Sequence, residues 1–216
     1  MSALTTENSL AEPRGGETGL VVRYPRLLNF GGLKATTHAI FGVTALAGTA
    51  LLAGTEPPML AYPVAIVASW LPDIDNPKSR LGNGLSRLKN PTANLAVRPL
   101  SWTFRITSFT LARTVGHRTL THSLLGLALF ALPVWLLLGS YPNFFYACVV
   151  GYGSHLLADA LNTRGVALLW PLGGSIRLLP GGIRSGGVWE LGVAVATLLI
   201  AGFAVSHVYP AIDGFL

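Results

Sequence analysis

Five apolar stretches of membrane-spanning length constrain this chain more than any other feature of its sequence. They lie at residues 37–54, 57–75, 120–139, 143–161 and 188–206. A helix needs about 20 mainly apolar residues to cross a bilayer, so each stretch is interpreted as one spanning helix. Pro63 and Pro72 interrupt the second stretch and make it the least regular of the five. The sequence therefore predicts an all-α polytopic membrane bundle of about five spanning helices.

The scarcity of charge agrees with this fold class. Charged residues make up 11% of the chain and hydrophobic residues 51%, whereas an ordinary soluble domain carries roughly 25% charged residues. The single Cys148 permits no internal disulfide and no cysteine-based zinc site. Residues 1–33 are expected to form an N-terminal cytoplasmic tail without a cleavable signal, and residues 34–216 one membrane-embedded domain.

The basic residues indicate how the helices are oriented. With five spans and the N-terminus inside, the positive-inside rule places the tail and the loops at 76–116 and 162–187 in the cytoplasm. All 15 Lys and Arg residues then fall on the cytoplasmic side, within or directly beside these segments. Apolar residues between the cations of the first loop predict amphipathic segments lying on the membrane surface. The net charge of +6 would then face anionic membrane lipids, so no nucleic-acid partner is expected.

Histidines and carboxylates gather at the predicted cytoplasmic ends of these helices. Ionisable groups at such positions are costly unless they have a functional partner. His155 and Asp159 are four residues apart and project from one face of a helix, while His207 falls at the opposite end. The predicted cluster, which we interpret as a set of metal ligands, comprises His38, Asp73, Asp75, His117, His122, His155, Asp159 and Glu190.

Imidazole and carboxylate ligands suit zinc, manganese or iron better than calcium. A catalytic zinc usually takes three protein ligands, so four histidines and four carboxylates favour two divalent ions, with some carboxylates orienting the imidazoles. Each residue taken alone also has a structural reading. His155 and Asp159 could form an ion pair within their helix, and Asp73 and Asp75 could pair with the neighbouring cations.

Such a site predicts metal-assisted hydrolysis, in which the metal acidifies a water and polarises the bond to be cleaved. An aspartate such as Asp75, a histidine or Glu190 would be the general base. Lys78 and Arg118 stand next to proposed ligands and could hold an anionic group such as phosphate. The expected substrate is a phosphoester, either small or lipid-linked.

Four motifs resemble a known family. They are LPDIDNPKS at residues 71–79, GHR with THS at 116–123, HLLAD at 155–159 and LLWP at 168–171. In this order they resemble the bacterial membrane-bound metal-dependent hydrolases, also called LexA-binding inner-membrane-associated hydrolases. The likeness covers about residues 36–195 and implies a metal-dependent hydrolase of the bacterial inner membrane. Thr119 stands where the family commonly has Gly, and Asn76 where a His can occur. No LexA partner is predicted.

Two other functions remain open at this point. The same ligands could form the transport site of a metal or proton transporter, although the outer halves of the predicted spans carry no ionisable residue that would continue a path. Alternatively, the protein could be a non-catalytic membrane scaffold whose metal ties the helices together.

Overall fold

The computed structural model describes residues 33–76 and 119–209, together with a few positions between 102 and 113. The α-helices in this part are α1 (Leu33–Ala53), α2 (Ala61–Trp70), α4 (Leu124–Leu138), α5 (Pro142–Ala160) and α6 (Val188–Val208). There are also two short 3-10 helices: η1 (Leu71–Asp75) directly follows α2, and η2 (Leu120–His122) precedes α4. The described residues contain no strand, in agreement with the predicted all-α fold.

The number of spanning helices differs from the prediction of five. Among the described residues, two helices qualify by length and composition as candidate spans, Ala35–Ala53 and Val188–Val208, and α4 is apolar but shorter. The second predicted span is shortened at both ends. The prolines at 57 and 58 precede a turn, so α2 begins only at Ala61. Because Pro72 has no N–H to continue the α-helical pattern, the chain tightens into η1 after Trp70.

The start of α1 also differs from the sequence-based expectation. The first predicted span begins at residue 37, but the helix begins four residues earlier, at Leu33. Thr37 is therefore a buried residue inside the helix, and its hydroxyl donates to Glu190 Oε1 at 3.1 Å. At the start of α4, Ser123 acts as the N-cap, since its Oγ accepts from Gly126 N at 3.0 Å.

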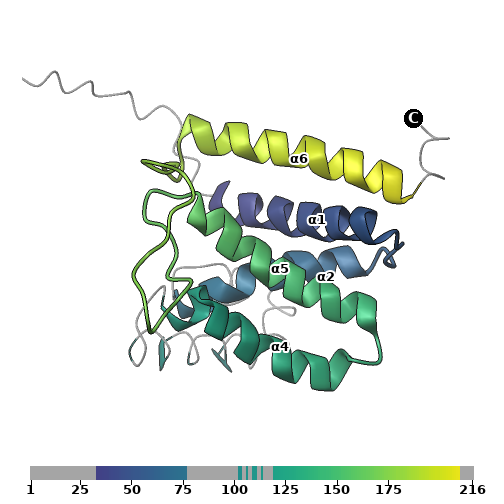
Figure 1. Ribbon diagram of the computed structural model, residues 1–216, viewed down its shortest axis with the longest axis horizontal. Coiled ribbons are helices and arrows are strands. Elements are labelled where there is room, and N and C mark those ends of the chain that lie inside the picture. Colours follow the sequence, from purple (N-terminus) through teal and green to yellow (C-terminus); the bar gives the residue numbers. More distant parts are fainter. Residues whose placement is uncertain are drawn as a thin grey trace, which may run out of the picture.

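Small residues let the helices approach closely. In Figure 1, α6 lies beside α1, α1 lies beside the pair α2 and α5, and α4 flanks α5 on the other side. Gly151 of α5 packs directly on the backbone of Ala65 in α2, and Gly42 of α1 meets the same turn of α2. Helices that associate inside a membrane typically use such small residues at their contacts.

Large apolar side chains point outward from the bundle. Leu136 and Leu137 of α4 and Leu199 of α6 are 70% or more exposed, and only 22% of the candidate span in α6 is buried. Exposed apolar patches of this extent indicate a surface that is covered in the native environment. Lipid is the natural covering for helices of this length and composition.

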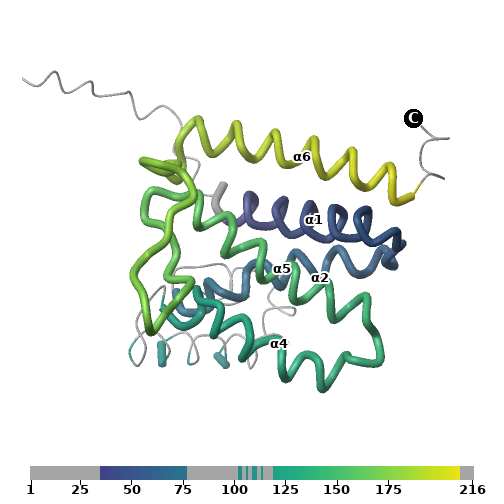
Figure 2. The backbone as a smooth tube through the Cα atoms, viewed as in Figure 1, coloured from purple at the N-terminus to yellow at the C-terminus, as the bar shows by residue number. Residues whose placement is uncertain are grey.

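Each of the five described α-helices has one of its ends at the same end of the molecule. In Figures 1 and 2 the first turns of α1, α4 and α6 and the last turns of α2 and α5 lie at one end, with the loop that connects α5 to α6 beside them. The candidate site lies at this end.

Candidate metal centre

The centre of the site is a pair of buried histidines from two different elements. His155 lies on α5, and His122 is the last residue of η2, immediately before α4. Both side chains are 0% exposed. Their Nε2 atoms face each other at 3.2 Å, with the two rings nearly edge to face. Two imidazoles in this position need a proton or a cation between their nitrogens.

The other ring nitrogen of His155 is held by α2. Its Nδ1 lies 2.7 Å from the backbone carbonyl of Ser69. A carbonyl oxygen can only accept, so Nδ1 carries the hydrogen and the neutral ring presents a lone pair at Nε2. Gly151, one turn before His155, allows α5 to approach α2 closely enough for this contact.

His122 is oriented in the same way by side chains. Thr121 Oγ1 donates to Asp75 Oδ2 at 2.9 Å and lies 3.0 Å from His122 Nδ1. Since the hydroxyl proton is used on Asp75, the hydroxyl oxygen accepts from Nδ1–H of His122. The Oδ2 atom of Asp75 is itself 3.6 Å from Nδ1. The neutral ring of His122 therefore also presents Nε2 as a lone pair.

Two carboxylates complete a set of donors around the paired nitrogens. Asp73 Oδ1 lies 3.7 Å from His122 Nε2 and 4.0 Å from His155 Nε2. Asp159 Oδ2 lies 3.6 Å and 3.9 Å from the same two atoms. Two nitrogens bound tetrahedrally to one zinc, at about 2.0–2.1 Å each, would be about 3.3 Å apart, which matches the observed 3.2 Å. The donor set thus fits a divalent ion.

His38 extends the cluster toward α1. Its ring stacks on that of His155 with centroids 4.0 Å apart, and its Nε2 is 3.8 Å from Asp159 Oδ1. The described residues contain three groups of potential ligands, and within each group the ligand atoms lie within 4.8 Å of one another. They are His38 with Asp73 and His155, His122 with His155 and Asp159, and Asp73 with Asp75 and His122. Because the groups share residues, they do not fix the number of ions that the cluster holds. The predicted count of two ions stays a prediction.

The charges of the cluster shift the protonation of its members in the absence of metal. His122 and Asp73 both lie on the 3-10 turns, outside the two candidate spans. Burial by itself would lower the pKa of His122, but the nearby carboxylates of Asp73, Asp75 and Asp159 raise it to about 9. Burial likewise opposes ionisation of Asp73, yet His122 and the neighbouring imidazoles hold its pKa well below its usual range. The proton on His122 occupies the position that a metal would take.

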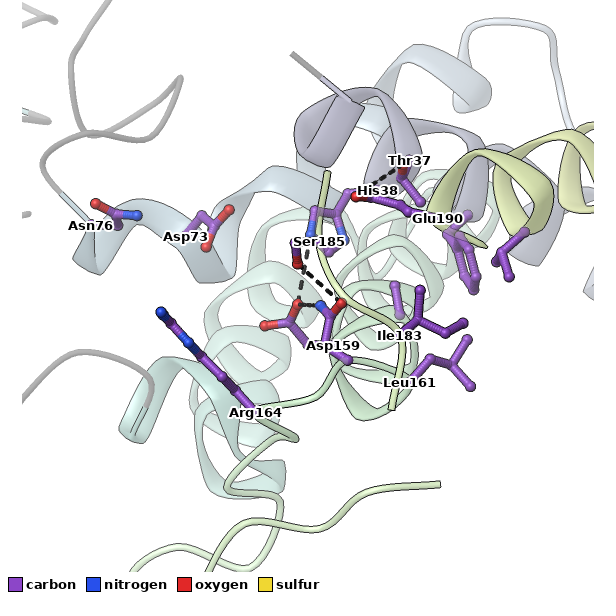
Figure 3. A pocket seen from close by; sticks show the side chains of 14 residues that line it. Thr37, His38, Asp73, Asn76, Asp159, Leu161, Arg164, Ile183, Ser185 and Glu190 are labelled. Carbon is purple, nitrogen blue, oxygen red and sulfur yellow. Dashed lines mark hydrogen bonds and ion pairs between the residues drawn. The ribbon is translucent and has the colours of Figure 1, made fainter. Parts of the chain in front are cut away.

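A pocket opens beside the cluster at the same end of the bundle (Figure 3). The residues that line it come from α1, η1, the end of α5, the following loop and α6. They include His38, Asp73 and Asp159 of the cluster, and Arg164 of the loop. The cluster of potential ligands is therefore reachable from outside along this pocket.

Hydrogen bonds fix Asp159 and Glu190 at the wall of the pocket. Asn162 Nδ2 donates to Asp159 Oδ1 at 2.9 Å, and Ser185 Oγ donates to Asn162 Oδ1 at 3.1 Å. This leaves Oδ2 of Asp159 directed at the histidine pair. Glu190 accepts from Thr37 Oγ1 through Oε1 and from Gly186 N through Oε2, so its carboxylate joins α1, α6 and the loop.

The structure brings together six of the eight predicted ligands: His38, Asp73, Asp75, His122, His155 and Asp159. Glu190 lies at the same end but in none of the ligand groups of the described residues, and both its oxygens accept protein hydrogen bonds. Asp75, predicted as a general base, faces His122 and does not line the pocket. The predicted residues His117, Arg118 and Lys78 lie outside the described residues.

Several contributors were not assigned from the sequence. The carbonyl of Ser69 and the hydroxyl of Thr121 orient the two histidines. The position of Thr121 directly before His122, within one of the motifs, could have indicated its role. The role of Ser69 could not be predicted in this way, because every residue type has a backbone carbonyl.

Comparison with known proteins places the chain among inner-membrane proteins. A family model described as YdjM inner membrane protein matches residues 33–208. The inner membrane protein YdjM of Escherichia coli (strain K12) is 39% identical over 122 residues, which are 54% of this chain and 52% of that protein. The uncharacterized protein YvsG of Bacillus subtilis (strain 168) is 28% identical over 180 residues, 82% of this chain and 93% of that protein.

No solved structure matches the chain, and the chain spans about half the length of the Escherichia coli relative. The inner-membrane part of the resemblance found from the motifs is confirmed, and the two apolar helices agree with an inner-membrane location. The metal-dependent hydrolase part stays a prediction. Because the family model covers every described helix, the chain belongs to the YdjM inner membrane protein family.

Proposed function

We propose that this protein is a membrane-bound metal-dependent hydrolase that acts at the cytoplasmic face on a phosphoester, either small or lipid-linked. The observation that carries the proposal is the buried pair His122 and His155, whose Nε2 atoms face each other at 3.2 Å. In both rings the Nδ1 hydrogen is already donated to a protein acceptor. Imidazoles fixed in this tautomer are typical of protein metal sites.

A divalent metal bound there would acidify a water and polarise the scissile group. The residues supply the rest. His122, His155 and Asp159 would hold the ion, and the Ser69 carbonyl and the Thr121 hydroxyl keep the two rings in position. Asp73 lines the pocket and is 28% exposed, so we assign it, in place of Asp75 or Glu190, to accept the proton of the attacking water.

The surroundings of the pocket support a substrate presented by the membrane. The loop at 162–187 carries exposed leucines, among them Leu172 at 94% and Leu178 at 52% exposure. Apolar side chains on a loop beside basic residues are typical of a segment lying at the level of lipid headgroups. The multi-pass arrangement with the N-terminus and the site in the cytoplasm is part of this proposal, and the distribution of Lys and Arg supports it.

The direct test is an assay on the purified full chain in detergent, loaded in turn with zinc, manganese or iron. Release of phosphate or headgroup is measured from a panel of small phosphoesters and phospholipids. We expect turnover in the wild type, and loss of both metal and turnover in His155→Gln. His207→Gln is the matched control, because His207 is exposed near the C-terminal end of α6, the end opposite to the site.

Two results would contradict the proposal. Metal-loaded wild type that cleaves no phosphoester, while His155→Gln loses metal and thermal stability together, would indicate a scaffold. Metal flux into proteoliposomes without turnover would indicate a transporter.

A further inference from the structure

The pocket that leads to the cluster is rich in negative charge. Asp73, Asp159 and Glu190 all line it, and Arg164 is the one Lys or Arg among its described lining residues. A bound divalent ion would bring the sum of these charges to about zero. Among the described residues, Arg164 is therefore the one that offers positive charge to an anionic substrate entering the pocket.

Arg164 is free to make such a contact. Within the part of the chain that the structure describes, its guanidinium takes part in no hydrogen bond or salt bridge, although it shares the pocket with three carboxylates. Arg177 of the same loop differs, since its Nη1 lies 3.5 Å from the Thr163 carbonyl. In Figure 3 the side chain of Arg164 extends toward the part of the pocket where Asp73 and Asn76 lie.

The backbone that carries Arg164 is held in place relative to Asp159. Asn162 N donates to Asp159 O at 3.1 Å, and Gly165 N donates to Asn162 O at 3.0 Å. Gly165 has a φ of 68°, and a side chain there would collide with the Ile176 carbonyl. Thr163 N also donates to the Ile183 carbonyl at 3.2 Å. This turn fixes where the guanidinium can reach and keeps it next to a predicted metal ligand.

We propose, on the basis of the hydrolase function above, that Arg164 binds the phosphoryl group of the substrate and makes the pocket selective for phosphoryl compounds. A guanidinium presents paired N–H donors that match two oxygens of a phosphate. Arg164 is thus a substrate-binding residue in addition to Lys78 and Arg118, which the sequence predicts for the same task. The ligand chemistry is a phosphate group, carried by a lipid headgroup or by a soluble compound.

The test is binding of inorganic phosphate to the purified full chain by calorimetry, with the metal content of each sample measured separately. We expect Arg164→Gln to weaken phosphate binding by about 10- to 100-fold, because a charged hydrogen bond contributes roughly 1.5–3 kcal/mol. Arg164→Lys should recover part of the affinity. Arg184→Gln is the matched control: it removes the same charge from the same loop, but Arg184 does not line the pocket. All variants should keep the wild-type metal content.

The outcome can be separated from the fate of the proposed function. Equal phosphate affinity in wild type and Arg164→Gln, or no phosphate binding by the wild type, overturns the assignment of Arg164 whatever the metal content. Absence of metal from the wild type contradicts the hydrolase function instead. The phosphate affinities of wild type and Arg164→Gln can still be compared in the same titrations.

A second arm identifies the source of the phosphate group. The wild type is placed in nanodiscs of phosphatidylcholine with or without phosphatidic acid, and glycerol phosphate is titrated into detergent samples. Competition with inorganic phosphate by phosphatidic acid supports a lipid headgroup, and competition by glycerol phosphate alone supports a soluble ligand. Competition that Arg164→Gln leaves unchanged in both media overturns the proposal.

Discussion

His122 and His155, 33 positions apart in the chain, meet Nε2 to Nε2 at 3.2 Å in the buried interior of this protein. Each ring donates its Nδ1 hydrogen to a fixed acceptor, the Ser69 carbonyl for His155 and the Thr121 hydroxyl for His122. Two lone pairs directed at each other are unfavourable without a cation between them. This pair is the structural basis of the proposed metal centre.

Thr121→Val should weaken metal binding by about 10- to 100-fold, as is typical when a group that orients a ligand is lost. The change keeps the shape of the side chain but removes the hydroxyl that bridges Asp75 and His122. Thr121→Ser keeps the hydroxyl and should bind metal almost as the wild type does. Competition titrations with a chelator measure the affinities. Equal affinity in Thr121→Val and Thr121→Ser would mean that the hydroxyl does not orient His122.

Gly151→Ala should separate α2 from α5. The added methyl group would collide with the Ala65 carbonyl, and overpacking of this kind typically costs about 1–3 kcal/mol. We expect a lower unfolding temperature and weaker metal binding, since the Ser69 contact to His155 depends on the same approach. Gly153→Ala is the control on the same helix, because its methyl group would meet nothing within 4 Å. Thermal unfolding in detergent compares them, and equal behaviour of the two variants would count against the close contact.

Asn162→Leu should impair the site by removing the side-chain donor to Asp159. Asn162 Nδ2 donates to Asp159 Oδ1 at 2.9 Å, so the substitution removes a hydrogen bond that orients a proposed ligand. Metal affinity should fall by at least about tenfold. Ser185→Ala, which only removes support from Asn162, should have a smaller effect. The reverse order of the two variants in a metal titration would refute this arrangement.

The pH dependence of stability should differ between metal-free and metal-loaded protein. The pKa of His122 is raised to about 9 in the folded metal-free state, above its value of about 6.5 in an unfolded chain. The resulting stabilisation is complete below about pH 6.5 and is lost as the pH rises through about 9. The unfolding temperature of chelator-treated protein should therefore fall across this window. Metal-loaded protein should not show this fall, because a metal-bound imidazole is already deprotonated.

His122→Gln is the control for this prediction, since the variant has no imidazole to titrate at that position. A metal-free wild type whose unfolding temperature stays constant or rises between pH 6.5 and 9 would show that His122 carries no raised pKa.

The gathering of the ligands at one end could be predicted from the sequence. His38 begins one apolar stretch, and His155 and Asp159 end another, so antiparallel helices of similar length bring them to the same level. The i,i+4 spacing also predicts that His155 and Asp159 share a face. These inferences need only the lengths of the stretches and the helical period.

The detailed roles could not be predicted, because they depend on contacts between distant segments. Asp73 and Asp75 lie on a 3-10 turn, whose rotation decides which carboxylate faces the pocket and which faces His122. The hydrogen bond from Thr37 to Glu190 depends on α1 starting before Thr37. The length of α2 follows from where the turn after Pro58 ends, and proline position alone does not give that boundary.

Metal content is the measurement that tests the central claim most directly. The full chain is purified in detergent from cells grown without added metal. Elemental analysis then gives the identity of the metal and the number of ions per chain. The account predicts at least one zinc, manganese or iron ion per wild-type chain, loss of that ion in His122→Gln and His155→Gln, and its retention in His207→Gln. A wild-type protein that is folded, that carries none of these metals and that takes up none on addition would contradict it.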